Sequence, residues 1–74
     1  MRDTMRYAVI IEKGESGFGA YVPDLPGCVA AGATRDEVVK LIQEAIEFHI
    51  EGLKDDGQPI PEATLTIEFV NVAA

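Results

Sequence analysis

The segment that decides the fold is Phe18-Gly-Ala-Tyr-Val22-Pro23-Asp-Leu-Pro26-Gly-Cys28. Its first five residues include aromatic and β-branched side chains, which favour an extended strand over residues 18–22. Pro23 and Pro26 each lack a backbone N–H and have a fixed φ, so neither can lie inside a regular central strand. Together with a glycine that supplies permissive backbone geometry, they predict a shaped loop over residues 23–27.

Two further extended segments flank this one. Residues 6–12 (RYAVIIE) are aromatic and β-branched and predict a strand. The polar, glycine-rich residues 13–17 predict that this strand forms a hairpin with residues 18–22. On the other side, residues 28–32 (CVAAG) are short, small and apolar. They favour a third strand, although periodicity alone does not exclude a helix.

A helix is predicted from Thr34 to about Lys54. Thr34-Arg-Asp-Glu37 has the form of a capping box, in which the threonine hydroxyl accepts a hydrogen bond from the N–H of Glu37. Gly57 is placed as a left-handed cap, and the prolines at 59 and 61 prevent the helix from restarting. At about 100° per residue, six side chains fall on one largely apolar face: Val38, Leu41, Ile42, Ala45, His49 and Leu53.

The last predicted element is a fourth strand over residues 64–70, where apolar and polar residues alternate. The order strand, strand, strand, helix, strand places the chain in the α+β class, with one amphipathic helix packed on a small, mostly antiparallel sheet. A chain of 74 residues has no room for a second domain. We therefore expect residues 1–74 to form a single domain.

Composition restricts the partners of the chain. Thirteen acidic residues outweigh six basic ones, and the net charge of -7 repels a phosphate backbone, so we expect no direct nucleic-acid binding. No apolar run approaches the roughly 18 residues that span a bilayer, and we expect no membrane association. A single cysteine is compatible with a reducing compartment, and no signal peptide is evident, so we expect a cytoplasmic location.

The small size also predicts self-association. A chain of this mass hides only about 60% of its unfolded surface on folding, so a monomer is expected to be marginally stable. The helix carries apolar residues beside its core-facing strip, and the end of the chain continues as an apolar strand edge. We expect an oligomer or partner surface that includes Val39, Ile46, Ile50, Val70 and Val72.

The titratable residues do not predict catalysis, a metal site or a cofactor. His49 lies on the apolar face of the helix, where a packed, hydrogen-bonded histidine is the expected state. Cys28 is expected to be buried and inert, since a reactive Cys28–His49 pair also needs an orienting group and oxyanion donors. The sequence leaves open whether these two side chains touch. The acidic residues occupy loops or the polar face of the helix, so we expect a non-enzymatic protein.

Several motifs together resemble the HicB family of antitoxins: Tyr7-Ala-Val-Ile-Ile-Glu12, Gly17-Phe-Gly-Ala-Tyr-Val-Pro-Asp-Leu-Pro-Gly-Cys28, Gly32-Ala-Thr-Arg-Asp-Glu37, and Ala45-Ile-Glu-Phe-His-Ile-Glu-Gly-Leu53 with Ile60-Pro61. The resemblance implies a partial ribonuclease H-like fold, β-β-β-α-β, that binds proteins and lacks the acidic catalytic cluster of true ribonuclease H. It also implies a partner, a small HicA toxin that cleaves messenger RNA. A net acidic chain suits such a basic, RNA-binding partner.

Two questions stay open at this level. The chain ends soon after the predicted fourth strand, without the DNA-binding domain that many relatives carry, so an alternative is an orphan homo-oligomer with a structural or regulatory role and no toxin. Asp24 either accepts hydrogen bonds within its own turn or presents its carboxylate to a basic partner. The motif residues whose role is unassigned are Pro23, Asp24, Leu25, Pro26, Gly27 and Cys28.

Overall fold

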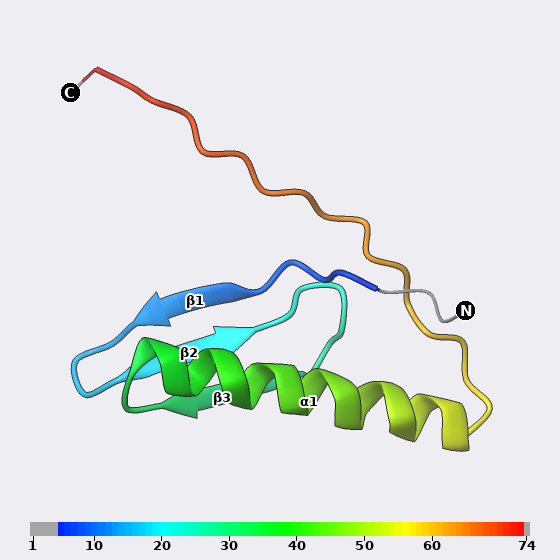
Figure 1. Ribbon diagram of the computed structural model, residues 1–74. Helices are drawn as coiled ribbons and strands as arrows, with labels where there is room; N and C mark the ends of the chain where they lie inside the picture. Colours follow the sequence, from blue (N-terminus) through cyan, green and yellow to red (C-terminus); the bar gives the residue numbers. More distant parts are fainter. Residues whose placement is uncertain (1–4, 74) are drawn as a thin grey trace.

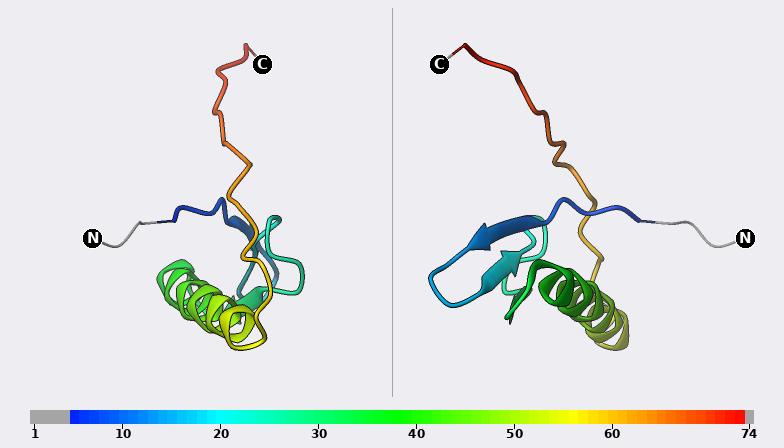
Figure 2. Two further views of the ribbon diagram at one scale, coloured as in Figure 1. Left: turned by 90° about the vertical axis from the view of Figure 1, so that its right-hand side faces the viewer. Right: turned by 60° about the vertical axis from the view of Figure 1, so that its left-hand side comes forward.

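The computed structural model describes residues 5–73, which form three strands and one helix (Figure 1). These elements are β1 (Ile10–Lys13), β2 (Phe18–Tyr21), β3 (Val29–Gly32) and α1 (Arg35–Asp55). The strands form an antiparallel sheet in the order β1-β2-β3, and α1 packs across one face of it (Figure 2). The predicted α+β class, with an amphipathic helix on a small antiparallel sheet, is confirmed.

β1 and β2 form the predicted hairpin, but β1 begins at Ile10 rather than at Arg6. The reason lies in its partner strand. Ile10 pairs with Tyr21, the last residue of β2. The chain then turns into the loop at Pro23, which has no N–H to donate. Residues 6–9 therefore have no β2 residues beside them with which to pair.

Residues 22–28 form two consecutive turns that bury one leucine. The N–H of Leu25 donates to the carbonyl of Val22 at 3.0 Å, and the N–H of Cys28 donates to the carbonyl of Leu25 at 3.0 Å. The N–H of Val22 also donates to the carbonyl of Cys28 at 3.1 Å, which closes the loop. Pro26 and Gly27 occupy the centre of the second turn, and Gly27 has a φ of 84°, as a type II turn requires. Leu25, at the junction of the turns, is fully buried.

The start of α1 is set by the predicted threonine cap. The Oγ1 of Thr34 accepts a hydrogen bond from the N–H of Glu37 at 3.1 Å. The Oε1 of Glu37 reaches back to the N–H of Ala33 at 3.3 Å, one residue earlier than in the usual capping box. Two backbone donors at the helix start are thereby satisfied by side chains.

The end of α1 is set by Gly57, as predicted. Gly57 has a φ of 69°, a left-handed conformation that glycine adopts without steric cost. The N–H of Gly57 donates to the carbonyl of Lys54 at 3.1 Å, and the N–H of Gln58 donates to the carbonyl of Leu53 at 2.9 Å. This pair of bonds is a Schellman motif, which satisfies two carbonyls of the last turn.

A small core joins α1 to the sheet. Its buried members come from β2, from the loop that follows, and from the first half of α1: Ala20, Val22, Leu25, Cys28, Val38 and Ile42. Half-buried side chains pack around them, chiefly from the strands and from the middle of α1: Tyr7, Val9, Ile11, Phe18, Ala30, Ala45 and Ile46. The second half of α1 extends beyond the sheet (Figure 1).

The predicted fourth strand is not formed, since residues 58–73 contain no strand. We call residues 64–73 the arm. The arm runs away from the sheet (Figures 1 and 2), and Phe69 is 93% exposed. A strand needs a neighbour that satisfies its N–H and C=O groups, and within residues 5–73 the arm reaches none. The prediction of a strand here was wrong, because alternation of residues does not supply a pairing partner.

Hydrogen bonds hold the base of the arm. The hydroxyl of Tyr7 donates to the carbonyl of Pro61 at 2.5 Å. The N–H of Thr64 donates to Oδ2 of Asp24 at 3.1 Å, and its hydroxyl donates to Oδ1 of Asp24 at 2.8 Å. The Thr64 hydroxyl is the main reason that the pKa of Asp24 lies below its ordinary value. Burial, together with the nearby charge of Asp24, raises the pKa of Tyr7.

We expect Val38→Ala to lower the free energy of unfolding by about 2 kcal/mol, because it removes two buried methyl groups from a fully buried side chain. Val29→Ala is the matched control. It makes the same chemical change at a residue that is 64% exposed, and it should change stability by no more than about 0.5 kcal/mol. Urea unfolding followed by circular dichroism measures both. Equal effects would contradict the core described here.

We expect Thr64→Val to raise the pKa of Asp24 toward its ordinary value, because valine keeps the shape of threonine but has no hydroxyl. Thr66→Val is the control, since Thr66 is exposed in the arm. Carboxyl NMR titration of Asp24 in the three proteins measures the change. Folding lowers the pKa of Asp24, so the contact adds to the free energy of unfolding. This addition is complete above the ordinary carboxyl pKa and is lost as pH falls through the folded-state pKa. An Asp24 titration that is unchanged in Thr64→Val would show that the contact is not made in solution.

Candidate protein-binding surfaces

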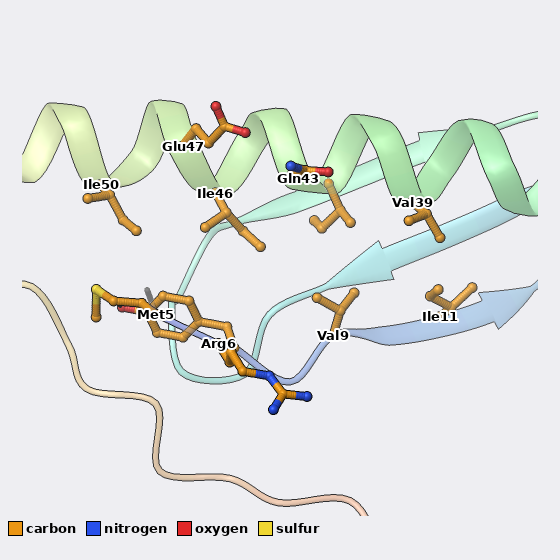
Figure 3. A pocket seen from close by; sticks show the side chains of 11 residues that line it. Met5, Arg6, Val9, Ile11, Val39, Gln43, Ile46, Glu47 and Ile50 are labelled. Atoms are coloured by element: carbon orange, nitrogen blue, oxygen red, sulfur yellow. The ribbon is translucent and has the colours of Figure 1, made fainter. Parts of the chain in front are cut away.

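An apolar groove lies between α1 and the β1 side of the sheet (Figure 3). Val39, Ile46 and Ile50 project into it from α1, while Val9 and Ile11 face them from the first extended segment and β1. The groove has a volume of about 620 Å³, and its lining is completed by Met5, Arg6, Tyr7, Ile42, Gln43 and Glu47. The structure therefore brings together the three helix residues that were predicted as a partner surface.

The sequence explains the position of this groove. Val39, Ile46 and Ile50 are separated by seven and four residues, so they form a line along one side of α1. This line lies beside the core strip that contains Val38 and Ile42 and that packs on the sheet. β1 is an edge strand of the sheet, so its outer backbone groups have no partner strand within residues 5–73. An apolar groove next to a free strand edge can accept an extended peptide.

The other two predicted surface residues lie elsewhere. Val70 and Val72 belong to the arm, where they are 76% and 79% exposed, and they do not line the groove. Leu65 and Ile67, which the prediction placed on the buried face of a fourth strand, are about half exposed in the arm. The chain therefore has two separate apolar surfaces, the groove and the arm.

The residues of the Pro23–Cys28 motif are divided between the core and the surface. Leu25 and Cys28 point into the core, and burial raises the pKa of the Cys28 thiol, which disfavours the nucleophilic thiolate. Pro23, Pro26 and Gly27 are largely exposed. Asp24 is half-buried, and its carboxylate accepts two hydrogen bonds from Thr64. The structure adds to the two alternatives for Asp24 a contact that neither included, the anchoring of the arm.

His49 is half-buried on α1 and is not a member of the core cluster that contains Cys28. Within residues 5–73 no group of three histidine, cysteine or acidic side chains is arranged to hold a metal ion. In the same range no helix has the length and apolar character needed to cross a membrane.

Sequence reasoning missed the two residues that complete the base of the arm, Tyr7 and Thr64. Both were assigned to strands, and neither was expected to donate a side-chain hydrogen bond. Their acceptors lie 54 and 40 residues away in the chain, so no local spacing indicates either contact. The sequence indicated only that Asp24, an acidic residue between two prolines, accepts hydrogen bonds. It did not indicate which residue donates them.

Comparison with known proteins gives consistent results. Residues 7–73 match the family described as HicB_like antitoxin of bacterial toxin-antitoxin system. The chain is 40% identical over 67 residues to a 14.9 kDa protein of Haemophilus phage HP1, covering 90% of this chain and 50% of that protein. It is 33% identical over 75 residues to Antitoxin HicB 2 of Photorhabdus laumondii, covering 100% of this chain and 54% of that protein. It thus spans about half the length of these two relatives.

A solved structure is also similar. A chain of the HicA3 and HicB3 toxin-antitoxin complex superimposes with a TM-score of 0.65 at 42% sequence identity. The match covers 74% of this chain and 64% of that chain. The matched family spans nearly the whole sequence, including the Pro23–Cys28 motif, α1 and the arm. On this evidence the chain belongs to the HicB-like antitoxin family.

Proposed function

We propose that this chain is a non-enzymatic protein-binding module that binds and neutralises a small HicA-like toxin that cleaves messenger RNA. The observation that carries the proposal is the likeness, in both sequence and fold, to a chain of a toxin-antitoxin complex. The net charge of -7 supports it, since an acidic chain associates quickly with a basic, RNA-binding partner. The proposed site of action is the cytoplasm, where messenger RNA is available.

We place the toxin-binding surface on the outer side of α1. Phe48 projects there with 80% of its surface exposed, although it is large and aromatic. Two exposed acidic residues lie beside it on the same side of the helix, Glu44 four residues before and Glu51 three residues after. Exposed aromatic side chains often supply much of the binding energy in protein interfaces, and surrounding charges steer the partner. The combination suits a basic protein with an apolar pocket.

We also propose that the protein is a homo-oligomer, because the groove and the arm expose apolar surface that the acidic side of α1 does not share. This observation alone requires no toxin. It therefore supports the alternative function as well, an orphan homo-oligomer with a structural or regulatory role. A genomic locus without a toxin gene, together with a stable homomer, would favour that alternative.

We expect Phe48→Glu to weaken toxin binding by at least about tenfold, because it removes an apolar anchor at the proposed interface. The test is co-purification and calorimetry with the HicA-like protein encoded beside this chain in its native genome, followed by an RNA cleavage assay. Wild-type protein should suppress cleavage, and Phe48→Glu should suppress it poorly. Val29→Glu is the matched control, since it adds the same charge at an exposed apolar position in β3.

Two outcomes would count against the proposal. If the wild-type chain fails to bind the neighbouring toxin, the antitoxin function is wrong for this protein. If Phe48→Glu and Val29→Glu bind equally well, the function stands but its position on α1 is wrong. Binding that weakens as salt rises from 50 to 300 mM, about the range over which surface charges become screened, is expected for the acidic surface.

A further inference from the structure

We infer that two copies of this chain exchange arms. In this arrangement the arm of each copy lies along the free edge of β1 in the other copy and covers its groove with Leu65, Ile67 and Phe69. The inference deepens the proposed homo-oligomer and rests on it, and it does not depend on a toxin. It covers the groove of each copy with the arm of the other.

The sequence of the arm is that of a strand with one covered face along most of its length. Leu65, Ile67 and Phe69 alternate on one face, opposite two threonines and Glu68. Phe69 and Val70 are adjacent apolar residues, and they point to opposite sides of an extended chain. The pattern therefore indicates that the face with Leu65, Ile67 and Phe69 is covered, and that the end of the arm has apolar residues on both faces.

The exposed area has the size of an interface. The chain has an accessible surface of 6203 Å², whereas a compact monomer of 8.0 kDa is expected to expose roughly 4,500 Å². Its radius of gyration is 14.2 Å, against about 11 Å for a compact domain of this length. The surplus of about 1,700 Å² per chain corresponds to about 3,400 Å² for two chains, which is about twice a standard interface and lies in the range that obligate homodimers bury. This is the area that a second copy would remove from water.

The groove and the arm also match in length. Val39 and Ile50 are eleven residues apart on α1, which corresponds to about 16 Å along the helix axis. Leu65, Ile67 and Phe69 span four residues of extended chain, about 13 Å, at intervals of about 6.6 Å. This interval is close to the roughly 6 Å between Ile46 and Ile50 along the helix, but shorter than the roughly 10.5 Å between Val39 and Ile46. The three side chains of the arm therefore cover most of the length of the groove without matching its three helix residues one to one.

The base of the arm explains why the occupant is a second copy rather than the arm of the same chain. Thr64 is held by Asp24, and Tyr7 holds Pro61, so the point at which the arm leaves the domain is fixed. From that point the arm leads away from β1 in both views (Figures 1 and 2). A hollow of about 530 Å³ separates the start of the arm from residues 6–9.

Reciprocal exchange closes the assembly at two copies. Each copy donates one arm and receives one, so the interface has twofold symmetry and leaves no free arm or groove. Each arm continues the three-stranded sheet of the other copy as an edge strand, which satisfies backbone groups of β1 that have no partner in one copy. Glu68 is the only charged residue in the arm, so covering the arm requires little desolvation of charge.

The test is the mass in solution, measured by size-exclusion chromatography with light scattering. Wild-type protein is expected to have twice the mass of one chain at micromolar concentration. Phe69→Glu damages the arm and Val39→Glu damages the groove, and each is expected to raise the dimer dissociation constant by at least about tenfold. Phe48→Glu is the matched control for Phe69→Glu, because both replace an exposed phenylalanine, and it should remain dimeric.

A mixture of the two damaged proteins separates arm exchange from other dimers. A heterodimer of Phe69→Glu and Val39→Glu has one contact between an intact arm and an intact groove, and both substitutions fall in its other contact. Either homodimer has one substitution in each of its two contacts. Because a second substitution in a contact that is already lost costs little, the mixture is expected to dimerise more tightly than either protein alone. A mixture that associates no more tightly than either variant, while both remain folded by circular dichroism, would overturn the inference. A dimer that survives Phe69→Glu would also overturn it, since the interface would then lie on another surface.

Hydrogen exchange on the wild-type protein gives a test that needs no variant. Amides of residues 65–70 are expected to be protected in the dimer and to lose protection on dilution, while β2 and α1 remain protected. Fast exchange in the arm of a stable dimer would contradict the inference. A monomer with a protected arm would show that the arm folds onto its own β1. This result would overturn both the arm exchange and the homo-oligomer. It would not bear on toxin binding.

Discussion

The burial of Leu25 is the interaction on which the rest of the structure depends. Its side chain is fully enclosed where the loop, β2 and α1 meet. Two turns place it there, and three backbone hydrogen bonds close them. Because Pro23 and Pro26 restrict the backbone on either side, burying Leu25 also fixes the direction of Asp24. The turns that fill the core therefore also present the carboxylate that holds the base of the arm.

The parts of the fold that depend on local chemistry could be predicted from the sequence. Thr34 and Gly57 mark the two ends of α1, because each acts on backbone groups within a few residues of itself. The hairpin and the shaped loop follow from the same kind of signal. Val39, Ile46 and Ile50 were recognised as a surface because helical periodicity shows which residues share a side.

The parts that could not be predicted depend on distant partners. The start of β1 is limited by where β2 ends, and this is a property of the pairing rather than of residues 6–9. The fourth strand has the correct alternation, but alternation does not say which edge, or which copy, supplies the hydrogen bonds. The Tyr7–Pro61 and Asp24–Thr64 contacts join residues from opposite ends of the chain. Each is a single polar pair, which leaves no pattern for sequence reasoning to detect.

The side chains of α1 face three different surroundings on a single helix of 21 residues. Val38 and Ile42 fill the core, Val39 and Ile46 line the groove, and Phe48 faces solvent among acidic residues. Each residue added to a helix rotates everything after it by about 100°. A one-residue insertion near Gln43 would leave the buried Val38 and Ile42 in place but turn Ala45, Ile46 and Ile50 toward other surroundings. The length of α1 between Ile42 and Ile50 is therefore more constrained than the identity of most residues within it.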